Sequence, residues 1–150
     1  MRAIIQRVKN AKVQSEGKTT GKIGKGLFIL LGVGENDTPE DSIWLSNKIS
    51  NLRIFDDADG KMNLSLMEIK GECLVVSQFT LHAKTKKGNR PSFIKAAKPQ
   101  LANELYMDFV HKMEILTGEN IQTGSFGQHM DIDILADGPV TIMIDTKNKE

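Results

Sequence analysis

The residues best suited to chemistry form the run Ser77-Gln78-Phe79-Thr80-Leu81, which comes directly after the apolar stretch Leu74-Val75-Val76. Polar groups therefore become available where a buried strand ends. Ser77 lacks the flanking glycines of a nucleophile elbow, and Thr80 needs a base beside it before it can act as a nucleophile. Backbone N–H groups offer a second route, because they stabilise a developing oxyanion, and losing one such donor costs roughly 3–4 kcal/mol of barrier.

A second notable segment is Gly138-Pro139, which stands directly before the strand-like run 140–144. A peptide bond before proline can be cis at a cost of only about 0.5–1 kcal/mol, and a preceding glycine removes a side-chain clash. A cis bond here would turn two carbonyl groups the same way and present a rigid wall. Taken alone, the segment is equally typical of an ordinary proline turn between strands.

Together these segments resemble the SQFTL and GPVT motifs of the D-aminoacyl-tRNA deacylases, at residues 77–81 and 138–141. The similarity extends to the start of the chain (residues 1–8), to Gly60-Lys61-Met62-Asn63 and to Arg90-Pro91-Ser92-Phe93. These five segments cover essentially the whole chain in the order that the family shows. One departure is Ala136, which stands where the family usually has asparagine two residues before the glycine.

The resemblance implies an enzyme that hydrolyses the ester bond of D-aminoacyl-tRNA, and also of mischarged glycyl-tRNA, without a metal or an organic cofactor. In the family, the backbone of the SQFTL strand lines the amino-acid pocket, and the neighbouring ribose hydroxyl of the tRNA assists catalysis. Carried over by position, this makes Ser77, Gln78, Phe79 and Thr80 the catalytic candidates, with Phe79 and Thr80 acting through their backbone.

The resemblance also implies a homodimer that binds the acceptor end of aminoacyl-tRNA. In the family, the Gly-Pro wall of one subunit enters the pocket of its partner, where it excludes L side chains. Gly138 and Pro139 occupy the wall positions, and Arg7 matches an arginine that supports them, although a surface strand position explains Arg7 nearly as well.

Two alternatives to this interpretation stay open. The chain is a non-catalytic module that binds tRNA or other RNA through a basic segment, or it is a deacylase variant with a trans Gly-Pro bond and relaxed chirality. The second variant resembles PQATL in place of SQFTL, so the Ser77–Thr80 run favours the chirality-selective form.

Charge is unevenly distributed along a chain whose net charge is only +1. Residues 1–25 carry seven lysines and arginines against one acid, and residues 84–98 carry six and no acid. This asymmetry suits a protein that offers a basic face to a polyanion. For the first segment a solvated strand face is an equal interpretation. In the second we expect contacts with tRNA phosphates from Lys84, Lys86, Lys87 and Arg90.

Several other classes of protein are disfavoured. No apolar run reaches the roughly 20 residues that span a bilayer, and the polar start does not resemble a secretory signal. The single cysteine, Cys73, lies in an apolar run and is expected to be buried. A cytoplasmic protein with one domain over residues 1–150 is the consistent expectation.

Three apparent ligand motifs fail on spacing. Gly32-Val33-Gly34 follows a strand, but Asp37 stands where a dinucleotide-binding loop needs glycine. Residues 57–60 imitate part of a calcium loop without its first and last ligands, so a tight turn is favoured. The histidines share no metal-ligand spacing and are interpreted as structural; they are His82, His111 and His129.

The elements that must position the candidate site begin with strands. Runs at 3–8, 11–14 and 19–23 predict a strand followed by a hairpin, and 27–31 is continuous enough to be buried on both faces. Two further strands are expected at 130–135 and 140–144, joined by a hairpin-like corner at 136–139.

Two helices complete the prediction. Thr38 and Pro39 open a helix that should end near Arg53, with Ile43, Trp44, Ile49 and Leu52 on its buried side. A longer helix runs from Pro99 to Leu116, with Gly118 as its stop and one apolar stripe made by Leu101, Leu105, Phe109, Met113 and Leu116. The expected fold class is α+β, with a curled, largely antiparallel, barrel-like sheet and two packed helices.

Overall fold

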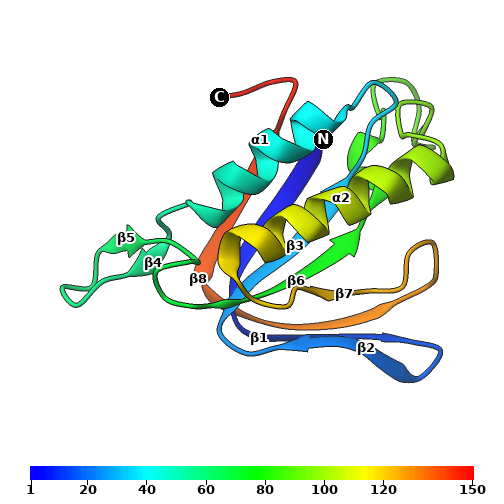
Figure 1. Cartoon of the computed structure of the whole chain (residues 1–150). Helices are drawn as coiled ribbons and strands as arrows, with labels where there is room; N and C mark the ends of the chain where they lie inside the picture. The colour runs from blue at the N-terminus through cyan, green and yellow to red at the C-terminus, as the bar shows by residue number, and fades with distance from the viewer.

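A computed structural model describes residues 1–150 and shows a curled β-sheet with two helices packed on one face (Figure 1). The expected α+β class with two main helices is confirmed. In chain order the elements are β1 (Arg2–Ser15), β2 (Lys18–Ile23), β3 (Gly26–Gly32), α1 (Pro39–Ser50), β4 (Phe55–Asp56), β5 (Met62–Leu64), β6 (Glu72–Ser77), the 3-10 turn η1 (Phe79–His82), α2 (Pro99–Thr117), β7 (Gln122–Thr123) and β8 (Asp131–Asp145).

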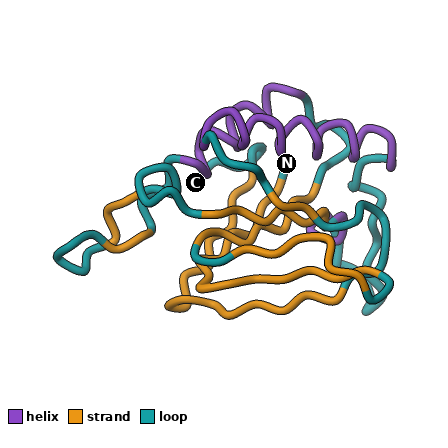
Figure 2. Tube along the Cα trace, turned by 60° about the horizontal axis from the view of Figure 1, so that its bottom comes forward, coloured by secondary structure: helices purple, strands orange, loops and turns teal.

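The main sheet has the strand order β2-β1-β3-β6-β7, and β8 pairs with the free side of β1. The pairs β1–β2, β1–β3 and β1–β8 are antiparallel, whereas β3–β6 and β6–β7 are parallel. The sheet is therefore mixed, and the expected antiparallel character holds for only part of it. Strong curling brings β2 close to β7, which gives the barrel-like shape seen in Figure 2.

Strand β3 is buried on both faces, as its continuous apolar run predicts. Leu27, Ile29 and Leu31 point into the cluster that the helices cover. Phe28 points the other way, into a second cluster that includes Val8 from β1. The curl produces this second cluster, because it folds the far half of β1 and all of β2 over the face that the helices leave open.

Helix α1 begins where predicted and ends at Ser50, three residues before the expected end. Its start is held by Asp41, whose carboxylate accepts hydrogen bonds from the backbone N–H and the hydroxyl of Thr38. The predicted burial of Ile43 is wrong, since this side chain is 47% exposed. The buried face instead carries small serines, and Ser42 lies beside Asp108 of α2, so the two helices pack closely there.

Helix α2 agrees with the prediction in both position and buried face. It spans Pro99–Thr117, and Gly118 follows as its C-cap. Leu105, Phe109 and Met113 are fully or almost fully buried. Tyr106 joins them, and its hydroxyl donates a 2.8 Å hydrogen bond to the carbonyl oxygen of Val75 in β6. The helix is thereby tied to the middle of the sheet.

The expected corner at residues 136–139 is wrong, because β8 is one continuous strand. Both of its halves pair with β1, from Arg2 opposite Asp145 to Gln14 opposite Asp131. The register shifts near Val8, where Gly138 and Pro139 lie opposite β1. A bulge within one strand, not a reversal of the chain, accommodates the proline.

The tight turn predicted at residues 57–60 lies at the tip of the small β4–β5 hairpin, which projects from the body (Figures 1 and 2). The Asp57 carboxylate accepts hydrogen bonds from the backbone N–H groups of Asp59 and Lys61, which closes the turn. Neither α1 nor α2 is long and apolar enough to cross a membrane.

Replacing Phe109 by alanine tests the helix-covered core. Phe109 is fully buried between α2 and the sheet, so Phe109→Ala should lower the free energy of unfolding by about 3–5 kcal/mol. Ile115→Ala on the same helix is the matched control, because Ile115 is 68% exposed, and a change below about 0.5 kcal/mol is expected. Equal losses in urea denaturation would contradict this assignment of the core.

Candidate active site

A cavity of about 610 Å³ opens where the parallel strands β3 and β6 end. The carboxyl ends of parallel strands meet at one edge of a sheet, and ligands commonly bind there. Leu31 pairs with Ser77 at this edge. Most of the wall is apolar, and it is lined by Leu31, Val33, Val76, Ser77, Gln78, Phe79, Phe93, Ala96, Ala97, Pro99, Ala102, Tyr106, Phe126, Gly127, Gln128, His129, Met130 and Ile132.

The chain leaves β6 through a hydrogen-bonded turn. The backbone N–H of Gln78 donates to the carbonyl oxygen of Leu31 at 2.8 Å, which continues the parallel pairing one residue beyond Ser77. The 3-10 turn η1 then begins at Phe79, and Ala83 N–H donates back to Thr80 at 3.0 Å. The predicted catalytic run thus begins at the end of β6 and continues into a hydrogen-bonded turn at the cavity.

Gly32 at the end of β3 allows this turn to lie directly against the strand. A Cβ atom at position 32 would stand 2.8 Å from the carbonyl oxygen of Gln78 and 3.0 Å from Cβ of Leu81. Any larger residue would therefore displace the turn. Gly32 begins the incomplete dinucleotide-binding motif of the sequence, and in the structure it has a local packing role instead.

Two backbone N–H groups of the turn are free to bind another molecule. Those of Phe79 and Thr80 take part in no hydrogen bond of the chain. The first N–H groups of any helical turn lack partners within that turn. Neighbouring free amides of this kind are suited to stabilise an oxyanion.

The side chains of the turn offer no activated nucleophile. The Thr80 hydroxyl accepts a hydrogen bond from the Gln78 side-chain amide, which cannot act as a base. Thr80 does not line the cavity, whereas Ser77, Gln78 and Phe79 do. Cys73 is buried as predicted, and burial raises the pKa of its thiol to about 12, so that it stays protonated.

His82, at the end of η1, is the histidine nearest to the turn. Burial lowers its pKa, so the imidazole is neutral at pH 7, and its Nε2 atom is buried without a hydrogen-bond partner. It packs against the backbone at Gly34, behind the turn. The structural interpretation therefore fits His82, while His111 and His129 are exposed.

Aromatic side chains form much of the cavity wall and its rim. Phe79, 56% exposed, packs edge-on against Phe93, with ring centroids 5.1 Å apart and planes at 75°. Deeper in the cavity, Tyr106 lies against Phe126. Tyr106, Phe126 and Met130 also line the cavity, and no sequence signal indicates this, because only the fold brings their elements close to the turn.

The basic segment follows η1 without a break. Backbone hydrogen bonds of 2.8 and 3.0 Å between Lys84 and Ser92 close it into a loop. Lys86, Lys87 and Arg90 are exposed on this loop. The loop joins η1 to Phe93, a residue of the cavity wall, so the four predicted phosphate contacts lie between two segments of the candidate site in the sequence.

Gly138 and Pro139 are exposed on β8 and do not line the cavity of their own chain. Their peptide bond is cis. Arg7, only 7% exposed, lies beneath them: its Nε donates to the Asp137 carbonyl oxygen at 3.1 Å, and its Nη1 donates to the Ile54 carbonyl oxygen at 2.8 Å. The predicted site residues thus form two groups, one at the cavity and one on β8.

Comparisons with known proteins agree on one family. A family model described as D-Tyr-tRNA(Tyr) deacylase matches residues 4–145. The chain is 55% identical to a D-aminoacyl-tRNA deacylase from Parabacteroides distasonis over 150 residues, covering 100% of both chains. It is also 55% identical to a D-aminoacyl-tRNA deacylase from Thermosipho africanus, covering 98% of both.

Solved structures share the fold of this chain. The structure of a protein named c-Myc DNA unwinding element binding protein is 39% identical with a TM-score of 0.91, covering 97% of this chain and 98% of that one. A structure described as a probable eukaryotic D-amino acid tRNA deacylase is 18% identical with a TM-score of 0.83, covering 95% and 97%, which shows a shared fold.

Arg7→Lys tests whether the guanidinium holds the segment before Gly138. A single ammonium group cannot reach the carbonyl oxygens of both Ile54 and Asp137, so the free energy of unfolding should fall by roughly 2–3 kcal/mol. Arg53→Lys is the matched control, because Arg53 makes its contacts to Asn63 at the exposed hairpin. An equal, small effect in both variants would show that Arg7 is not an anchor.

Proposed function

The chain belongs to the D-Tyr-tRNA(Tyr) deacylase family, and from this premise we propose that it hydrolyses the ester bond of D-aminoacyl-tRNA. Water adds to the ester carbonyl carbon, and the carbonyl oxygen becomes an oxyanion. The carbon–oxygen bond to the terminal ribose then breaks, the ribose oxygen takes up the proton that the attacking water loses, and free D-amino acid and tRNA are released.

The free N–H groups of Phe79 and Thr80 support this chemistry most strongly. Phe79 lines a largely apolar cavity, which suits an amino-acid side chain, and Thr80 follows it directly. Both N–H groups are without a partner in the chain, so they are available to donate to the oxyanion. An aminoacyl ester is already labile, so positioning and oxyanion stabilisation suffice without a side-chain nucleophile. In this proposal, the ribose hydroxyl beside the ester orients the attacking water.

Chirality is imposed by a second copy of the chain. We propose a homodimer in which Gly138 and Pro139 of one subunit enter the cavity of the other and exclude L side chains. The exposed position of these residues and the buried Arg7 beneath them support this role. Large apolar side chains along β8 also stay exposed in the single chain, as expected for an interface; they are Ile132, Ile134, Leu135 and Met143.

Glycyl-tRNA is a second substrate under the same proposal. Glycine has no side chain to meet the wall, so its ester can reach the turn as a D-aminoacyl ester does. For both substrates, the acceptor end of the aminoacyl-tRNA enters the site. In this proposal the tRNA phosphates lie near the basic loop at residues 84–92.

Non-catalytic RNA binding is the competing function. An exposed basic loop is expected of an RNA-binding module as much as of a tRNA deacylase, so the loop does not distinguish the two. The decisive experiment incubates purified protein with D-Tyr-tRNA(Tyr), L-Tyr-tRNA(Tyr) and glycyl-tRNA and follows release of the amino acid. Fast release from the D and glycyl esters only is expected. Binding without release would establish the competing function, and equal release from D and L esters would establish a chirality-relaxed deacylase.

Thr80→Ala distinguishes backbone from side-chain catalysis. Because the Thr80 hydroxyl has no base beside it, the single-turnover rate should stay within about tenfold of the wild type. Thr80→Ser provides the comparison, since a nucleophilic hydroxyl predicts a loss of several orders of magnitude in the alanine variant and its recovery with serine. That pattern would overturn the backbone mechanism.

Gly138→Ala tests the wall. At position 138 φ is +134° and a Cβ atom would stand 2.7 Å from the Val140 nitrogen, so this segment must move. The ratio of D to L hydrolysis rates should fall at least tenfold, because about 1.4 kcal/mol of lost exclusion is a tenfold change. Ala136→Ser, at a nearby exposed position on β8, should leave the ratio unchanged. If Gly138→Ala keeps the wild-type ratio of D to L hydrolysis rates, Gly138 and Pro139 do not form the wall that excludes L side chains.

The basic loop is tested by replacing Lys84, Lys86 and Lys87 together with alanine. We expect weaker tRNA binding, because fewer phosphates are neutralised. The logarithmic slope of the salt dependence should fall by roughly 0.7–0.9 for each phosphate that a lysine no longer neutralises. The ratio of D to L hydrolysis rates should not change.

A second triple variant controls for the removal of three positive charges. It replaces exposed lysines on and beside β2, which are Lys18, Lys22 and Lys25. If both triple variants change the salt slope equally, only overall charge matters, and the loop makes no specific contact.

A further inference from the structure

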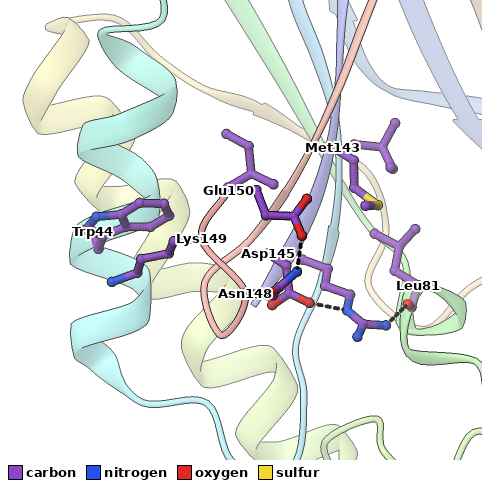
Figure 3. A pocket seen from close by; sticks show the side chains of 10 residues that line it. Trp44, Leu81, Met143, Asp145, Asn148, Lys149 and Glu150 are labelled. Atoms are coloured by element: carbon purple, nitrogen blue, oxygen red, sulfur yellow. Dashed lines mark hydrogen bonds and ion pairs between the residues drawn. The ribbon is translucent and has the colours of Figure 1, made fainter.

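Arg2, at the start of β1, bridges the C-terminal strand and the end of the catalytic turn. Its Nη1 donates a 2.9 Å hydrogen bond to the carbonyl oxygen of Leu81 in η1, and its Nε donates at 2.7 Å to the Asp145 carboxylate at the end of β8. In Figure 3 both contacts appear as dashed lines, one at the labelled Asp145 and one at the labelled Leu81. Residues far apart in the sequence therefore meet at the turn.

Hydrogen bonds, not packing, fix the Arg2 side chain. It borders two open cavities, one of about 550 Å³ beside Trp44 and Met143 and one of about 320 Å³ beside His82 and Lys84. Its side chain is 40% exposed. Since solvent-accessible space lies on both sides, the direction of the guanidinium depends on the carboxylate that holds Nε.

Asp145 is well suited to this task because it stays charged. Burial alone would raise the pKa of its carboxyl, but the backbone N–H of Lys147 and the guanidinium of Arg2 outweigh burial and lower that pKa below its usual range. The carboxylate is itself oriented by the Lys147 N–H, which donates at 2.9 Å. Arg2 thus binds a charged, oriented carboxylate at the end of β8.

Two hydrogen bonds tie the backbone of the turn to the rest of the sheet, one on each side of the free N–H groups. At the start of the turn, Gln78 N–H donates to the Leu31 carbonyl oxygen in β3. At its end, the Leu81 carbonyl oxygen accepts from Arg2. The free N–H groups of Phe79 and Thr80 lie between these two points, so their direction depends on both tethers.

We propose that Arg2 and Asp145 form a clamp that positions the Phe79 and Thr80 N–H groups for the oxyanion. This inference rests on the proposed esterase function, and it makes Arg2 and Asp145 positioning residues that never touch the substrate. Misplacing an oxyanion donor by about 1 Å is enough to lower a rate on the order of a hundredfold. The clamp acts on the chemical step and leaves substrate binding and chirality to other elements.

The test uses Arg2→Gln and Asp145→Asn in the full-length protein. Single-turnover hydrolysis of D-Tyr-tRNA(Tyr) at saturating enzyme should slow by about 10- to 100-fold in each variant, while the concentration for half-maximal rate stays within twofold. The double variant should be no slower than the worse single one, because both remove the same clamp. Amide hydrogen exchange in the peptide covering residues 78–83 should become faster, with an unchanged thermal transition.

Asp133→Asn is the matched control. Asp133 pairs with Lys12 at 3.4 Å and so joins the same two strands, β1 and β8, near their opposite end. Its side chain is 75% exposed and does not line the cavity. This variant should leave both the rate and the exchange at residues 78–83 unchanged. Equal losses in Asp133→Asn, or wild-type rate and exchange in Arg2→Gln, would overturn the clamp.

Failure of the clamp is distinguishable from failure of the proposed function. If the wild-type protein releases no amino acid, the esterase proposal fails, and hydrogen exchange alone decides whether Arg2 and Asp145 hold the turn. If the wild type is active and both variants keep its rate, the esterase proposal stands and the clamp is wrong.

Discussion

The parallel pairing of β3 with β6 is the constraint on which the rest of the structure depends. It brings Leu31 and Ser77 to the same edge, and the next backbone hydrogen bond, from Gln78 to Leu31, turns the chain into η1. The helices α1 and α2 cover one face of these strands, and the curl of the sheet covers the other. A site built on strands buried in this way has little freedom to shift, as positioned backbone donors require.

The site that we propose acts through backbone groups, and it therefore needs no activated side chain. Thr80 has no base, Cys73 is held protonated by burial, and His82 is neutral behind the turn. Under the proposed function, binding and selectivity are therefore divided among surfaces: the apolar cavity takes the amino acid, the basic loop takes the tRNA backbone, and the exposed part of β8 supplies the wall to a partner.

The sequence predicts the elements whose signals are local. Thr38 and Pro39 locate the start of α1, the stripe containing Phe109 locates α2, and the SQFTL run locates the strand end at the cavity. The sequence does not predict features that depend on strand pairing across the fold. Pro139 is typical of a turn, yet the runs on both sides of it pair with β1 and form one strand. Arg2 and Tyr106 carry no sequence signal for the site, since only the fold brings them to the turn.

The cross-subunit wall is tested most directly with a mixed dimer, in which one subunit carries Gly32→Ala and the other Gly138→Ala. The first change displaces the turn of its own chain, so only the Gly138→Ala subunit keeps a working turn. With two affinity tags the mixed dimer is purified and its D and L hydrolysis rates are measured. Because the Gly32→Ala subunit supplies an intact wall to that working site, we expect the wild-type ratio of D to L hydrolysis rates. A ratio equal to that of the Gly138→Ala homodimer would show that the wall acts within one chain, and the cross-subunit wall would be wrong.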